Sequence, residues 1–147
     1  MNWLYPSLGG IPNFLLYGAI GLVLTFIFAV IYIRITGHDE IALIRAHNAS
    51  AALSFGSSLI GFALPLSKAI AQASSVPDCI LWGVMALVVQ LSAYGVARLL
   101  LPGLSANIQN NAMSSAIVLA SISVVAGMLN AASMTYYPVV GGVIETL

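Results

Sequence analysis

Long uncharged stretches of apolar residues alternate with short polar segments along this chain. Four such stretches cover residues 13–33, 46–67, 79–97 and 111–135. A helix rises about 1.5 Å per residue, so roughly 20 apolar residues are enough to cross the hydrocarbon core of a bilayer. The pattern therefore predicts an all-α integral membrane protein, a bundle of four long helices that span the bilayer.

Turn-forming and charged residues predict where these helices begin and end. Gly37 suits the left-handed position after a first helix, and Asp39 suits the N-cap of a second. We expect Pro65 to kink or terminate this second helix near Ser67. The expected helices cover residues 13–34, 39–67, 79–101 and 110–134, with a short lead-in over 105–108.

The composition supports one membrane domain over residues 1–147. The chain is 61% hydrophobic and 5% charged, whereas soluble domains are about 25% charged. The predicted spans leave only short connections, so the main partner of this surface is the lipid bilayer. Net charge is zero and no Lys or Arg residues cluster, which excludes nucleic-acid binding through phosphate contacts. The single Cys79 cannot form an internal disulfide.

The two halves of the chain resemble each other. His47-Asn48-Ala49 recurs as Asn110-Asn111-Ala112. Each half, about 13–70 and about 79–135, contains a bulky helix, a polar connection and a second helix rich in small residues. We interpret the halves as two tandem transmembrane hairpins with the same orientation. Helical hairpins share this outline in general, so coincidence is the alternative.

The basic residues predict an orientation. Arg34, Arg45 and Arg98 belong to the two hairpin connections, and only Lys68 lies on the opposite side. Because cytoplasmic loops carry an excess of Lys and Arg, we expect the hairpin tips in the cytoplasm and both termini outside.

The second and fourth predicted helices each carry a stripe of small and polar residues at helical spacing. In lipid, such faces let two helices approach closely, so interhelical packing is the first interpretation. The alternative is that facing stripes from several subunits line a polar pathway. The stripe residues are Ser50, Ser54, Ser57 and Gly61 on one helix, and Ala116, Ala120, Ser123, Gly127 and Asn130 on the other.

Amide side chains in a span are costly against lipid, so each needs a partner in the bundle. Asn48 and Asn111, near equivalent helix ends, are expected to bind loop carbonyls. Gln90 and Asn130 lie deeper and are candidates for an interhelical hydrogen bond. We expect structural bonding rather than ligand contact from these amides and from Asn110.

The connection after the first helix holds the only cluster of ionisable groups in the chain. Its carboxylates and histidines could bind a metal or respond to pH. The spacing matches no standard metal site, however, and solvated helix caps with an ion pair explain the cluster equally well. The cluster is also the candidate surface for a protein partner. Its members are His38, Asp39, Glu40, Arg45 and His47.

The sequence contains no nucleophile elbow, phosphate-binding loop or Ser-His-Asp order. We therefore expect neither enzymatic activity nor a cofactor nor a bound metal. The spans contain no acidic or basic residue, which argues against a proton relay or an ion-coupled pump. A passive pore lined by hydroxyls and carbonyls is compatible with the composition.

Six runs of residues occur in a distinctive order: HNASAA at 47–52, LIGFALPL at 59–66, VPD at 76–78, WG at 82–83, LVVQL at 87–91 and LNAASMT at 129–135. Together they resemble the YjfL-like bacterial inner membrane proteins, domain of unknown function 350. The resemblance implies four spans, a two-fold repeat, a place in the bacterial inner membrane and at most an envelope-associated role. It supplies no catalytic residues. His47 stands where Asn or Gly is commoner in that family.

Two functions of different classes follow from these features. The first is a homo-oligomeric channel-like protein or permeation pathway, which requires several copies because four helices with few polar groups hardly enclose a pore. The alternative is a non-enzymatic scaffold or accessory subunit that recruits an envelope-stress partner through the tips at 34–47 and 98–111.

Overall fold

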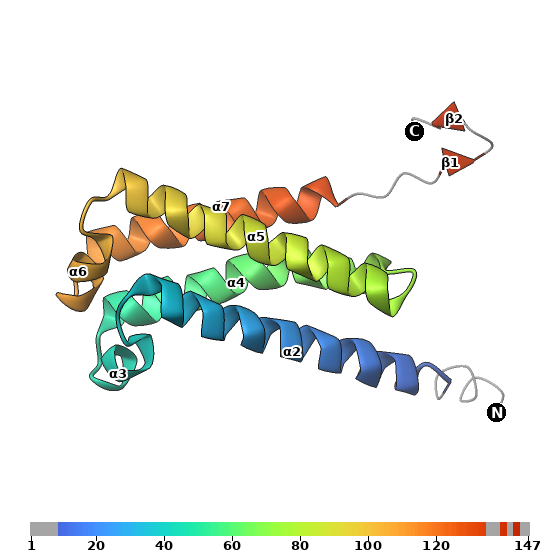
Figure 1. Ribbon diagram of the computed structural model, residues 1–147, viewed down its shortest axis with the longest axis horizontal. Coiled ribbons are helices and arrows are strands. Elements are labelled where there is room, and N and C mark those ends of the chain that lie inside the picture. Colours follow the sequence, from blue (N-terminus) through green and yellow to red (C-terminus); the bar gives the residue numbers. More distant parts are fainter. Residues whose placement is uncertain (1–8, 135–138, 141–142, 145–147) are drawn as a thin grey trace, which may run out of the picture.

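A computed structural model describes residues 9–134, 139–140 and 143–144 of the chain. Four long helices lie side by side in an elongated bundle (Figure 1). All four are long and apolar enough to cross a membrane, so the predicted set of spans is confirmed at this level. The long helices are α2 (Ile11–Thr36), α4 (Ala49–Gln72), α5 (Val76–Leu100) and α7 (Met113–Ser133).

Two six-residue helices, α3 (Glu40–Arg45) and α6 (Leu104–Gln109), connect α2 to α4 and α5 to α7. Both lie at the same end of the bundle (Figure 1), which we call the hairpin end. Strands β1 (Val139–Val140) and β2 (Val143–Ile144) pair in antiparallel fashion, with Val139 opposite Ile144. This ladder is the one departure from helical structure within the described residues.

The second predicted helix, 39–67, is wrong at both ends. It divides after Arg45, because His47 adopts a left-handed backbone with φ 61° and Asn48 then caps a new helix. That helix, α4, continues past Pro65 instead of ending near Ser67. Proline removes the N–H partner of the Gly61 carbonyl, and this carbonyl lies against Gly127 of α7. A neighbouring helix can thus compensate a proline inside a span.

The connection between α4 and α5 is shorter than the predicted 68–78. It consists of residues 73–75, and the Ser75 hydroxyl accepts from the Asp78 backbone N–H to cap α5. Pro77 and Asp78 occupy the first turn of α5, where proline and negative charge are favourable. At the other connection, α7 begins at Met113 rather than at Asn110, because Asn111 has a positive φ.

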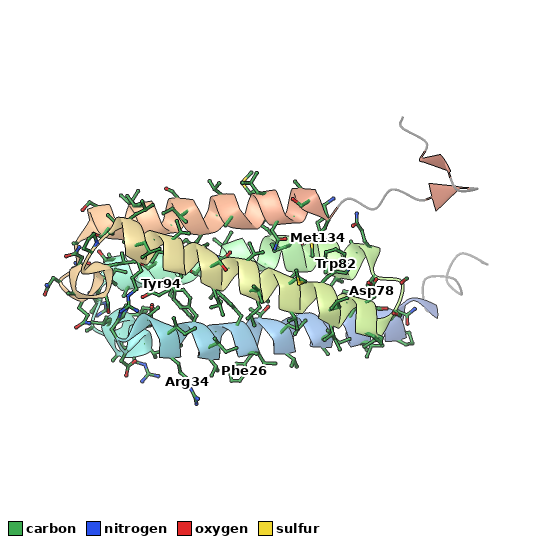
Figure 2. All side chains as sticks on the ribbon, turned by 45° about the horizontal axis from the view of Figure 1, so that its top comes forward. Phe26, Arg34, Asp78, Trp82, Tyr94 and Met134 are labelled. Atoms are coloured by element: carbon green, nitrogen blue, oxygen red, sulfur yellow. The ribbon has the colours of Figure 1, made fainter. Side chains whose placement is uncertain are left out.

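The core lies around α4. Half of the residues in the apolar stretch of α4 are buried, against 17% of the residues in the apolar stretch of α2. The buried side of α2 is a single row of residues: Gly21, Leu24, Phe28, Tyr32 and Thr36. Phe26 of the same helix is 70% exposed and points away from the bundle (Figure 2). Bulky apolar residues therefore cover the lipid-facing surface of α2, while the aromatic side chains of Phe28 and Tyr32 point into the core.

Candidate functional site

The two stripes of small residues meet inside a single chain. Gly61 and Gly127 are in such close contact that a methyl group at Gly127 would overlap the Gly61 backbone. One turn away, the Ser58 and Ser123 hydroxyls are 3.3 Å apart. The α4–α7 seam therefore has the close backbone approach expected of small residues in lipid.

The remaining stripe residues lie along this seam. Ser50, Ser54 and Ser57 are buried on α4, and Ala116 is buried on α7. The Ser54 hydroxyl donates to the Ser50 carbonyl, and the Ser57 hydroxyl to the Ser54 carbonyl. Ala120 and Asn130 are partly buried. The stripes thus line the inside of the bundle rather than its outer surface.

Asn48 and Asn111 tie the two halves together at the hairpin end. The Asn48 amide donates to the carbonyls of Ile108 and Gln109 at 2.9 and 3.1 Å, and its oxygen caps α4 at Ala51. The Asn111 side-chain oxygen accepts from the Ser50 backbone N–H at 3.0 Å. The prediction of bonding to loop carbonyls is confirmed for Asn48, whereas Asn111 binds a helix N–H instead.

The deeper amides behave differently from the prediction. Gln90 is 2% exposed, and its side-chain nitrogen approaches Gly61 but has no hydrogen-bond partner. The Asn130 side-chain nitrogen is also buried without a partner. These nitrogens therefore do not form the expected interhelical bond. Asn110 is exposed at the end of α6.

Glu40 is fully buried at the hairpin end. Its Oε1 lies 3.2 Å from Nε2 of His38, whose side chain is 2% exposed. The prediction of solvated groups is wrong for both residues, although the predicted cluster does contain an ion pair. The cap, Asp39, faces water and accepts from the Ala42 backbone N–H. Glu40 follows it by about 100° around the helix and therefore faces the bundle.

His38 joins the two connections. Its Nδ1 lies 2.7 Å from the Ser105 hydroxyl of α6 and 3.2 Å from the Thr36 carbonyl of α2. The Thr36 carbonyl also accepts from the Tyr94 hydroxyl at 3.4 Å. These contacts hold the imidazole ring against Glu40, and they come from residues that sequence reasoning missed.

Two buried tyrosines complete the surroundings of Glu40. The rings of Tyr32 and Tyr94 are 5.5 Å apart in an edge-to-face arrangement, and Tyr94 lies at the hairpin end (Figure 2). Both phenols interact electrostatically with Glu40. The Tyr32 hydroxyl is close to Ser58 but makes no hydrogen bond of good geometry. The sequence did carry a signal for these two residues: each half has a tyrosine near the end of its first long helix, Tyr32 in α2 and Tyr94 in α5.

The rest of the predicted cluster is on the surface. Asp39, Arg45 and His47 are exposed, next to an open groove of about 380 Å³ that Gly37, His38 and Gln109 help to line. Among the described residues, no three His, Cys, Asp or Glu side chains gather to hold a metal ion. His38 therefore lies between the open groove and the buried carboxylate, with its own side chain almost fully buried.

The sequence matches the model of the family described as Domain of Unknown Function (DUF350) over residues 6–134. The chain belongs to this family. It is similar to the UPF0719 inner membrane protein YjfL of Escherichia coli strain K12, with 39% identity over 120 residues, 82% of this chain and 91% of the relative. The corresponding protein of Escherichia coli O157:H7 matches with the same figures. No solved structure matches the chain. The family resemblance predicted from the sequence is thus confirmed.

The backbone at position 47 favours Gly or Asn over histidine for a physical reason. His47 and Asn111 both follow a six-residue helix and have φ values of 61° and 58°. The bonds from Asn48 N–H to Leu43 and from Ala112 N–H to Asn107 close the same helix-ending motif in both halves. This motif places its left-handed position where Gly or Asn is favoured.

Proposed function

We propose that this protein is a multi-pass inner membrane protein that provides a permeation pathway for small ions. The observation that carries the proposal is a file of buried polar groups that follows α4 through the bundle. It begins at Glu40 and His38, continues along Ser50 and Ser54, and reaches Gln90 at the centre of the seam. The file ends toward the other side of the membrane at Asn130.

Unpartnered atoms distinguish this file from ordinary helix packing. Buried polar atoms are nearly always hydrogen-bonded, because each one left unsatisfied is costly in a low-dielectric interior. Here several lie in sequence from the hairpin end inward. These atoms are Glu40 Oε2, Ser50 Oγ, the Tyr32 hydroxyl, Gln90 Nε2 and Asn130 Nδ2. Unsatisfied polar atoms of this kind suit a pathway through which a small ion passes better than a seam that stays permanently dry.

The orientation and assembly belong to the same proposal. Arg34, Arg45 and Arg98 are all at the hairpin end, which favours placing this end in the cytoplasm and both termini outside. An open groove between α5 and α7 has an apolar wall with small residues, among them Ser92, Ala93 and Ser121. Small faces promote helix association in lipid, so we propose homo-oligomers that use this groove. No enzymatic step is part of the proposal.

The two halves of the bundle are, in this proposal, tandem transmembrane hairpins. Each half contains a long helix, a six-residue helix and a second long helix. The matching left-handed residues after α3 and α6 support this interpretation.

Native mass spectrometry in a mild detergent measures the assembly, and a strictly monomeric protein contradicts the homo-oligomer.

Flux measurements on liposomes containing purified protein test the pathway. We expect proton or K⁺ flux above that of empty liposomes. Replacing Gln90 with Leu should reduce the flux at least about tenfold, since ~1.4 kcal/mol of added barrier is enough. Ser67→Ala is the control, because Ser67 is exposed and bonds only to its own helix at Leu64. Flux equal to that of empty liposomes contradicts the proposal.

A scaffold is the second candidate, and the exposed groove at the hairpin end favours it. Asp39 lines this groove, and Arg45 and His47 flank Ala46, another residue of its lining. These three are the predicted partner-binding residues that the structure leaves accessible. Such a scaffold would recruit an envelope-associated protein. Cross-linking in cells with all three residues changed to Ala discriminates the two functions, because the loss of one defined partner with unchanged flux favours the scaffold.

A further inference from the structure

The position of Glu40 does not require a carboxylate for folding. Glu40 is the first residue of α3, and Leu104 is the first residue of α6. Both side chains are buried, with exposed fractions of 0% and 1%. One connection thus fills this place with an apolar side chain, and the other with an ionisable one. Burying an acid where leucine packs is costly, so Glu40 calls for an explanation other than packing.

The contacts of His38 constrain the proton between the two residues. Nε2 faces Oε1 of Glu40 at 3.2 Å. If neither atom carried a proton, two lone pairs and a negative charge would face each other in a buried site. The contact is favourable only when a proton lies on Nε2 or on the carboxyl. The Thr36 carbonyl, which can only accept, favours a second proton on Nδ1.

Other charges do not compensate Glu40. Among the described residues, the titratable groups that interact with it are His38, Tyr32 of α2 and Tyr94 of α5. Arg98 of α5 interacts with Tyr94 and is exposed. The charged residue of α4 is Lys68, near its opposite end, and α6 and α7 contain none. The protonation of the pair therefore decides the charge at this end of the polar file.

A proton suits this site better than a metal ion. The described residues offer no third His, Cys, Asp or Glu side chain beside the pair, and metal sites use at least three protein ligands. A proton needs only the gap between Nε2 and Oε1. It also has a route, because His38 lines the open groove at the hairpin end while Glu40 lies behind it.

We propose that Glu40 and His38 form a proton-binding site reached from the hairpin-end groove. One proton leaves water in the groove and binds between Nε2 and Oε1, and the charge of the pair rises by one. No other bond forms or breaks. The site stands independently of transport, whereas its use as the entry point of the pathway rests on the proposed function.

The chain offers an unusually direct measurement. Its only glutamates are Glu40 and Glu145, and its only histidines are His38 and His47. In protein labelled with ¹³C-carboxyl glutamate and carrying Glu145→Gln, a single carboxyl signal reports on Glu40. In protein labelled with ¹⁵N-histidine and carrying His47→Asn, the ring signals report on His38. Both proteins are placed in lipid nanodiscs and titrated by NMR.

We expect the Glu40 and His38 signals to change over a shared pH interval, because a coupled pair titrates as a unit. In His38→Gln, the pH response of the Glu40 signal should change, since the carboxyl has lost the imidazole that faces it. Asp78→Asn, at the opposite end of the bundle, is the matched control, as asparagine keeps an oxygen that can accept from the Ser74 backbone N–H, and it should leave the titration unchanged. A Glu40 signal that does not change with pH, or that ignores His38→Gln, overturns the proposal.

Flux measurements separate this proposal from the function on which it draws. Glu40→Gln keeps the shape of the side chain and removes the proton site. If the pair titrates as expected and the unchanged protein conducts nothing, the site holds and the pathway is wrong. If the protein conducts protons and Glu40→Gln conducts them equally well, the site as entry point is wrong. Loss of proton flux in Glu40→Gln but not in Asp78→Asn supports both.

Discussion

The two connections at the hairpin end have nearly the same backbone and opposite chemistry. Each contains a six-residue helix, α3 or α6, and a left-handed residue, His47 or Asn111, before the next long helix. At the first position of these helices, one connection buries Glu40 and the other buries Leu104. The two positions therefore have the same packing requirement. We attribute the carboxylate at Glu40 to a function of the first connection.

This comparison also separates structural polar groups from functional ones. Asn48 and Asn111 are polar, but their hydrogen bonds fasten one half to the other. Glu40 has an ion-pair contact with His38 and otherwise no partner among the described residues. Satisfied groups stabilise a fold, whereas unsatisfied buried groups lower its stability and are retained where a site needs them.

Placing the acid in the second connection tests the comparison most severely. Leu104→Glu should destabilise the protein by about 3–5 kcal/mol, because it buries a charge at a site that lacks the histidine of the first connection. Thermal unfolding in detergent micelles measures the change. Ala106→Glu on the exposed side of the same helix should have little effect. Equal stability of the two variants would mean that α6 does not dock as described.

The reverse substitution should raise stability. The variant carries Glu40→Leu together with His38→Leu, so that no member of the pair stays buried alone, and exchanging a buried ion pair for apolar side chains is neutral or stabilising by about 1–4 kcal/mol. The same variant should lose the pH-dependent signals of the pair. A clear loss of stability in the unfolding measurement would show instead that the carboxylate holds the fold together.

The seam that brings the two halves together should be sensitive to a single methyl group. Gly127→Ala should cost about 1–3 kcal/mol, because the added carbon meets the Gly61 backbone. Gly56→Ala is the control in the facing helix, where a methyl group meets nothing within 4 Å; it should gain up to about 1 kcal/mol from helix propensity. If both variants unfold at the same temperature, the seam is looser than described.

Substitutions at the two left-handed residues should change the stability of the protein least, and in opposite directions. His47→Gly relieves a non-glycine residue with φ 61°, and should stabilise the protein by under about 1 kcal/mol after the entropy loss of glycine. Asn111→Gly relieves the same strain but loses the hydrogen bond to Ser50, so it should destabilise by about 0.5–1 kcal/mol. Denaturation midpoints of both variants against the unchanged protein distinguish the signs.

Much of the architecture was predictable from the sequence. The four spans, the cap at Asp39 and the small stripes on α4 and α7 all follow from local properties: hydropathy, turn chemistry and helical spacing. The break at His47 was missed, because a left-handed histidine has no strong local signal. The continuation of α4 past Pro65 was missed because the Gly61 carbonyl, which loses its N–H partner to the proline, is covered by Gly127, far along the chain.

By itself, the sequence determined that this protein is a bundle of membrane-length helices with polar connections, because transfer from water to lipid depends on composition that can be read along the chain. Only the tertiary structure decided that Glu40 is buried, that His38 contacts Ser105 across 67 residues, and that the stripes face inward. The direction of a side chain on a six-residue helix depends on where that helix docks, and docking is set by contacts between distant segments. For this reason a residue that looks like a solvated cap in the sequence is the buried acid of the candidate site.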